Sequence, residues 1–137
     1  MMLNCTNHPY STWSEPQRKA AVRYGEVIDL PFPSVDPLMK PEEPRRCVEI
    51  YAEQIPAMHP DVVLAAGEFT FLFMLVDKLL REGIRVVCAC SERKTVEVRL
   101  PDGSNEKKSV FCFEAFRNYE YFDVRGGTED GCEPAGT

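Results

Sequence analysis

Apolar and polar positions recur along the chain with two different periods, and these periods predict its elements. Short apolar runs at residues 2–6, 26–32, 60–67 and 84–90 have the length and composition of strands. Between them lie three segments, 14–25, 42–58 and 70–83, whose apolar residues fall three and four positions apart, as in helices that bury one face. Residues 94–100 and 107–116 alternate around an Asp-Gly pair, which predicts an antiparallel hairpin.

This order of elements predicts an α/β fold. Strands that alternate with helices favour a mostly parallel sheet covered by helices on both faces. With right-handed crossovers, the simplest solution is a three-layer, Rossmann-like domain in which four strands follow the flavodoxin-like order 2-1-3-4. The C-terminal antiparallel β-hairpin then extends one edge of the sheet. Residues 1–125 are expected to form this single domain, and the small, acidic residues 126–137 a disordered tail.

Composition and charge argue against several classes of function. Apolar residues make up 44% of the 137-residue chain, but no run approaches a membrane span or a signal peptide, so we expect a cytoplasmic protein without membrane contact. The net charge of −6 disfavours binding of duplex nucleic acid. The six cysteines form no C-x-x-C pair and no Cys/His cluster at zinc spacing, so we expect core thiols and no metal or cofactor.

Three strand ends are candidate ligand contacts, because open parallel sheets bind ligands at the carboxyl ends of their strands. They are residues 6–13 after the first strand, 67–70 after the third and 90–94 after the fourth. Small and polar residues dominate all three. We therefore expect them to meet at one rim.

Three side chains at these ends are candidates for catalysis. His8 is the natural acid or base, because an unperturbed imidazole titrates near neutrality, although a loop histidine before a proline is also a common structural residue. Glu68 could serve as a base, bind a ribose hydroxyl or simply cap the next helix. Arg93 could hold a phosphate through a forked contact, or lie in a solvated turn.

Other residues at these ends are candidates for ligand binding. Trp13 could stack on a base or cover the first helix. The remaining candidates are Asn7, Ser11, Gly67, Thr70, Ser91 and Glu92. Neither G-x-G-x-x-G nor P-loop spacing occurs, so neither a dinucleotide nor a nucleoside-triphosphate fingerprint is indicated.

The third predicted helix suggests a second copy of the chain. Its first two turns, "FTFLFMLV", are apolar nearly all the way round, whereas a helix on a sheet needs only one apolar stripe. Deeper burial in the core would explain the extra apolar residues, and so would a partner subunit. We expect a homodimer whose two-fold axis joins the strand ends.

The segments "LNCTNHPYSTWSEPQ", "YGEVIDLPFPSVDP", "GEFT" and "CSER" together resemble a group of small bacterial proteins. These are the compact Rossmann-like, CRISPR-associated accessory proteins of type III systems, several of which bind or cleave cyclic oligoadenylate messengers. The resemblance covers residues 2 to 120, and Pro56 and the acidic tail after Arg125 depart from the pattern.

The resemblance implies an antiviral-defence protein that binds cyclic oligoadenylate across the two-fold axis of a homodimer. A ring nuclease of this kind works without metal: a ribose 2′-hydroxyl attacks the adjacent phosphorus and leaves a 2′,3′-cyclic phosphate. By location, His8 would assist proton transfer and Arg93 would stabilise the developing charge. Two alternatives stay open: a non-catalytic sponge or sensor of the messenger, and a small enzyme acting on a nucleoside or sugar phosphate.

Overall fold

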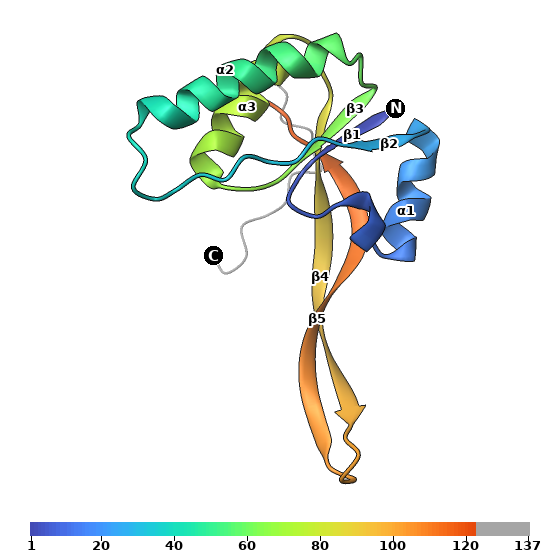
Figure 1. Ribbon diagram of the computed structural model, residues 1–137. Coiled ribbons are helices and arrows are strands. Elements are labelled where there is room, and N and C mark those ends of the chain that lie inside the picture. The colour runs from blue at the N-terminus through green and yellow to red at the C-terminus, as the bar shows by residue number, and fades with distance from the viewer. Residues whose placement is uncertain (123–137) are drawn as a thin grey trace, which may run out of the picture.

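A five-stranded sheet runs through residues 1–122, the part of the chain that the computed structural model describes (Figure 1). The strands are β1 (Met2–Cys5), β2 (Val27–Asp29), β3 (Val62–Ala65), β4 (Val86–Arg99) and β5 (Asn105–Asn118). The helices are α1 (Glu15–Ala21), α2 (Glu42–Ala57) and α3 (Phe69–Arg81), with short 3-10 turns η1 (Tyr10–Thr12) and η2 (Val22–Tyr24).

The strands follow the order β2-β1-β3-β4-β5. β1 pairs in parallel with both β2 and β3, β3 pairs in parallel with β4, and β5 runs antiparallel to β4. A mixed α/β fold with a mostly parallel sheet and a C-terminal antiparallel hairpin is thus confirmed. Because β1 and β3 end side by side, at Cys5 and Ala65, the loops that follow them emerge at the same edge of the sheet.

Helices cover both faces of the sheet (Figure 1). On one face, Leu3 and Val63 pack with the helices α2 and α3 in the larger buried cluster. On the other face, Met2 and Leu64 pack with Trp13 and with α1. Successive residues of β1 and β3 therefore enter opposite cores, and all of them are buried. This double burial explains why β3 reads as an unbroken apolar run, and why Asn4 is the one polar residue of β1.

A proline lies in the last turn of α2, close to the point where the helix ends. Pro56 lies in the final turn, and the helix stops one residue later, at Ala57. His59 then adopts a left-handed conformation with a φ of 52° and donates its backbone N–H to the carbonyl of Pro56. His59 therefore lies just beyond the end of α2 and closes its last turn.

The hairpin is longer than the sequence predicted. β4 does not end at Cys90: after a bulge between Cys90 and Ser91 it continues to Arg99, paired with β5 throughout. The expected loop at residues 90–94 is therefore wrong, and Ser91, Glu92 and Arg93 are strand residues. No glycine, proline or asparagine interrupts "CSERKTV", so the chain can remain extended. The paired strands project from the body as a twisted two-stranded arm (Figure 1).

The cysteines of the described residues are free thiols. Cys5 lies in the core, where burial raises the pKa of its thiol to about 12. Cys88 and Cys90 lie on one face of β4 with their sulfurs 4.0 Å apart. Cys132 and the predicted tail, residues 126–137, lie outside the described residues. Within residues 1–122, no helix has both the length and the apolar character that crossing a membrane requires.

Candidate functional site

A groove of about 490 Å³ opens beside the carboxyl ends of β1 and β3, on the face of the sheet that carries α1. We call it the α1-side groove. One wall is the loop after β1 with the start of α1, and the other is the root of the β4–β5 arm. Its lining residues are Thr6, His8, Thr12, Trp13, Ser14, Gln17, Leu64, Ala66, Cys88, Ala89, Ser91, Phe111 and Phe113.

A buried amide holds the loop that forms the first wall. Asn4 is only 1% exposed, and its Nδ2 donates to the carbonyl of His8 and to Oδ1 of Asp29, both at 2.8 Å. Its Oδ1 accepts a hydrogen bond from the Thr6 hydroxyl at 2.8 Å. The Thr6 oxygen in turn accepts from the backbone N–H of His8 at 3.1 Å. The backbone of the loop is therefore tied to β1.

Asp29 and Trp13 tie the rest of the loop to the sheet. The Asp29 carboxylate, at the end of β2, accepts the backbone N–H of Tyr10 at 3.1 Å. Trp13 is buried, and its Nε1 donates to the carbonyl of His8 at 2.9 Å. Its ring lies 6.3 Å from that of Phe116, so it packs against β5. Trp13 thus packs in the core with Ala21 of α1, in line with the alternative that it covers the first helix, and it also lines the α1-side groove.

The side chain of His8 is exposed at the rim of the α1-side groove, because the fold uses only its backbone. The His8 carbonyl accepts the hydrogen bonds from Asn4 and Trp13, so these bonds do not involve the imidazole. An imidazole in such a place can exchange a proton with a bound ligand.

A family comparison covers most of the chain. The family model described as "Uncharacterized protein MJ1673 family" matches residues 1–117. The chain belongs to this family. No curated protein and no solved structure matches the chain.

In this MJ1673-family chain, Ser91 and Arg93 lie on the arm and not on a loop. Ser91 lines the α1-side groove and pairs with Phe113, which also lines it. Arg93 pairs with Phe111, and its guanidinium lies 5.6 Å from the centre of that ring. Arg93 therefore stands directly beyond the wall of the α1-side groove, on the same side of the ribbon as Ser91, since side chains two apart share a face.

Glu68 faces its own helix. It is the N-cap residue of α3, and its carboxylate accepts the backbone N–H groups of Thr70 at 3.0 Å and Phe71 at 2.9 Å, with the Thr70 hydroxyl as a third donor. These bonds hold the pKa of Glu68 below its usual value, the Phe71 bond most of all. Neither Glu68 nor Thr70 is among the lining residues of the α1-side groove.

The other predicted binding residues lie apart from the α1-side groove. Asn7 is exposed on the loop, and Ser11 offers its carbonyl to Arg18 at 2.8 Å. Glu92 points to the opposite side of the arm from Ser91 and pairs with Lys94 at 3.7 Å. Gly67 packs against the ring of Phe32 and does not line the α1-side groove. Of the ten predicted site residues, the structure brings His8, Trp13 and Ser91 together, with Arg93 beside them.

Sequence reasoning missed the residues that build the walls in this family member. Asn4 and Asp29 were read only as strand residues, although a polar residue at the end of an otherwise apolar strand was a usable signal. Phe111 and Phe113 belonged to the alternating pattern of a hairpin, and nothing local indicated that they reach the loop of His8. Within residues 1–122, no three His, Cys, Asp or Glu side chains gather closely enough to hold a metal ion.

Proposed function

We propose that this protein binds an anionic nucleotide in the α1-side groove, and that the nucleotide is a cyclic oligoadenylate. The observation that carries the proposal is the pairing of aromatic walls with polar groups in one groove. Phe111 and Phe113 offer apolar rings of the kind on which bases stack, and the buried Trp13 lines the groove between α1 and the arm. His8 and Ser91 offer polar contacts along the same groove, and Arg93 supplies a cation at its edge.

The proposed reaction is cleavage of the messenger by its own ribose. A 2′-hydroxyl loses its proton to His8 and attacks the adjacent phosphorus, and the bond to the 5′-oxygen breaks. The products are a 2′,3′-cyclic phosphate and a 5′-hydroxyl, which forms when the leaving 5′-oxygen takes up a proton from water. Arg93 would neutralise the charge that builds up on the phosphoryl oxygens. No step uses Glu68, because its carboxylate is already occupied by three donors at the start of α3.

The engagement of Glu68 also favours a second candidate, a non-catalytic sponge or sensor for the same messenger. With Glu68 turned to its helix, His8 is the one acid–base group of the three catalytic candidates that lines the α1-side groove. Binding needs only stacking and charge, whereas cleavage needs protons to be taken up and released. A third reading is an enzyme for a nucleoside or sugar phosphate.

Two features of the chain fit the CRISPR-associated ring-nuclease class that the resemblance implies. The strand order β2-β1-β3-β4 agrees with a Rossmann-like, flavodoxin-like domain extended by a hairpin. The α1-side groove lies at the carboxyl ends of β1 and β3, where such sheets bind ligands. Under this proposal the protein acts in the cytoplasm, as a homodimer.

The test is incubation with cyclic tri-, tetra- and hexa-adenylate in the presence of EDTA, with separate measurements of affinity and product. We expect His8→Asn to slow formation of the 2′,3′-cyclic phosphate about 100-fold or more, with little change in Kd. His59→Asn is the matched control, because it removes the other histidine and asparagine tolerates its positive φ.

The results separate the candidates. Equal rates for His8→Asn and the unmodified protein would remove the role of His8. Tight binding without product would favour the sponge or sensor. Binding of mononucleotides, with no binding of cyclic oligonucleotides, would favour the third reading.

A further inference from the structure

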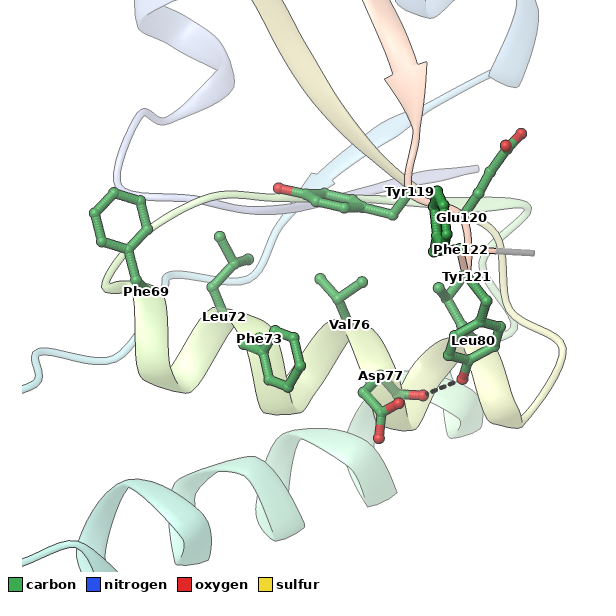
Figure 2. Close-up of a pocket in the computed structure, with 10 residues that line it drawn as sticks. All are labelled: Phe69, Leu72, Phe73, Val76, Asp77, Leu80, Tyr119, Glu120, Tyr121 and Phe122. Carbon is green, nitrogen blue, oxygen red and sulfur yellow. Dashed lines mark hydrogen bonds between the residues drawn. The ribbon is translucent and has the colours of Figure 1, made fainter. Parts of the chain in front are cut away.

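We propose that the protein forms a two-fold dimer through an apolar groove on α3, and that each copy keeps its own nucleotide site. The groove has a volume of about 580 Å³ and lies between α3 and residues 119–122 (Figure 2). We call it the α3 groove. The dimer is inferred from this surface alone, whereas the number of ligands per dimer also rests on the proposed function.

Two apolar stripes run along α3: one is fully buried in the core, and the other is only partly covered. Phe71, Leu75 and Leu79 form the first stripe and are fully buried against the sheet and α2. The second stripe lines the α3 groove and consists of Phe69, Leu72, Phe73, Val76 and Leu80. A helix that packs on one side of a sheet needs the first stripe only.

The second stripe is covered at one end and open at the other. The Tyr121 hydroxyl donates to the carbonyl of Asp77 at 2.8 Å, which holds the segment after β5 along the C-terminal half of α3 (Figure 2). Val76 is accordingly only 8% exposed. At the N-terminal half, Phe69 and Phe73 are 84% and 76% exposed. Exposed aromatic patches of this kind mark interaction surfaces.

The remainder of this chain is a poor match for the α3 groove. Residues 123–137 follow directly on Phe122, which is itself a lining residue. They include no aromatic residue, one branched aliphatic residue (Val124) and four carboxylates. Such a composition cannot supply the apolar area that two exposed phenylalanines require.

A second copy of the chain supplies that area. Phe69, Phe73, Tyr121 and Phe122 are each more than half exposed. At ~150–250 Å² for a whole aromatic side chain, they offer roughly 450–750 Å² per copy. A standard interface takes ~800 Å² from each partner, so these four side chains provide most of it.

An antiparallel, two-fold contact between the two α3 helices brings their exposed aromatic residues together. Phe69 and Phe73 of one copy lie against Tyr121 and Phe122, which cover the C-terminal half of α3 in the other. The two helix dipoles oppose each other, which is the favourable arrangement.

This contact keeps the two ligand sites apart. The α1-side groove lies on the face of the sheet that carries α1, whereas the α3 groove lies on the opposite face. A dimer built on α3 therefore turns both α1-side grooves outward. It predicts one ligand per chain, and not the single ligand across the two-fold axis that the resemblance implies.

Sedimentation equilibrium of the full-length protein tests the dimer. We expect a dimer for the unmodified chain and a monomer for Phe73→Glu, since a buried carboxylate in the contact would be unpaired. Ile50→Glu is the matched control: Ile50 is 61% exposed on α2, and its variant should remain a dimer. Unchanged circular dichroism would show that both variants fold. A monomeric unmodified protein, or a dimeric Phe73→Glu, would overturn the interface.

Calorimetry with cyclic tetra-adenylate tests the ligand count. We expect one ligand per chain and the same Kd for the unmodified protein and for the monomeric Phe73→Glu. One ligand per two chains, or loss of binding in Phe73→Glu, would overturn separate sites. If no cyclic oligoadenylate binds the unmodified protein, the prediction of one ligand per chain is wrong together with the proposed function. The sedimentation experiment then still tests the dimer.

Discussion

The ring of Phe32 packs directly on the backbone of Gly67. A Cβ placed on Gly67 would lie 2.1 Å from Cε1 of that ring, far inside van der Waals contact. The ring also meets Phe71 edge-on, with their centres 4.7 Å apart. The glycine between β3 and α3 is therefore needed for packing between the segment after β2 and the first turn of α3.

Gly67→Ala should destabilise the fold by overpacking. Gly67 and Gly83 both have positive φ values, 155° and 77°, but the space beside Gly83 is empty. We therefore expect Gly67→Ala to lower the free energy of unfolding by about 1–3 kcal/mol more than Gly83→Ala does. Urea unfolding of the two variants measures this difference. Equal losses would mean that the ring of Phe32 moves aside without cost.

Glu68→Gln should destabilise the protein in a pH-dependent way. The hydrogen bonds from Phe71 and Thr70 lower the pKa of Glu68 in the folded state, so its charge stabilises the fold above the unfolded-state pKa. This contribution is lost as the pH falls through the lowered pKa. The variant should therefore be less stable than the unmodified protein at neutral pH, and this difference should disappear as the pH falls through the lowered pKa. Glu53→Gln, on the exposed face of α2, controls for the change in net charge, and a pH-independent difference would contradict the capping role.

Asn4→Leu should loosen the loop of His8. The substitution removes the donor to the His8 carbonyl and to Asp29, and the acceptor of the Thr6 hydroxyl. Because these groups are partly or fully buried, we expect a loss of about 1–3 kcal/mol in the free energy of unfolding. Asn118→Leu removes an exposed bond to Arg85 and should change it by less than about 0.5 kcal/mol. Similar losses from both variants would show that the buried network adds nothing.

Arg93→Ala should weaken the binding of a phosphorylated ligand. A charge-assisted hydrogen bond is worth about 1.5–3 kcal/mol, which corresponds to a ten- to hundred-fold rise in Kd. Arg99→Ala is the control, since Arg99 lies on the same side of the arm but pairs with Asn105 near its tip. Calorimetry of both variants decides the question. Equal affinity for Arg93→Ala and the unmodified protein would show that the guanidinium stays on Phe111.

Most elements of this fold were predictable because their signals are local. The helical spacing of apolar residues marked α1, α2 and α3, and the buried runs marked β1 and β3. The predicted helix at 70–83 ends within two residues of α3, and Gly83, with its positive φ, follows the last turn. The error lay at Ser91, where the four consecutive polar residues "SERK" indicate a loop although no turn residue interrupts them. Pairing with β5, from Ser91 with Phe113 to Lys94 with Val110, keeps this segment extended.

The candidate site depended on contacts that no local pattern contains. His8 was identified from its residue type and its place after a strand. Only the tertiary structure shows that the Asn4 amide holds the backbone of His8, so that its imidazole stays exposed. Only the tertiary structure shows that Phe111 and Phe113 line the same groove as His8. Glu68, like His8, is a titratable residue directly after a strand, yet its carboxylate accepts hydrogen bonds from the backbone N–H groups at the start of α3.

The amino-acid sequence by itself determined the type and order of the elements, because periodic burial acts between residues three or four apart in a helix and two apart in a strand. It did not show that residues 84–90 and 94–100 belong to one continuous strand, β4. The tertiary structure decided which polar side chains reach the α1-side groove and which are used by the fold. That choice rests on hydrogen bonds and ring contacts between residues distant in the chain, as between Phe32 and Gly67 or Asn4 and Asp29.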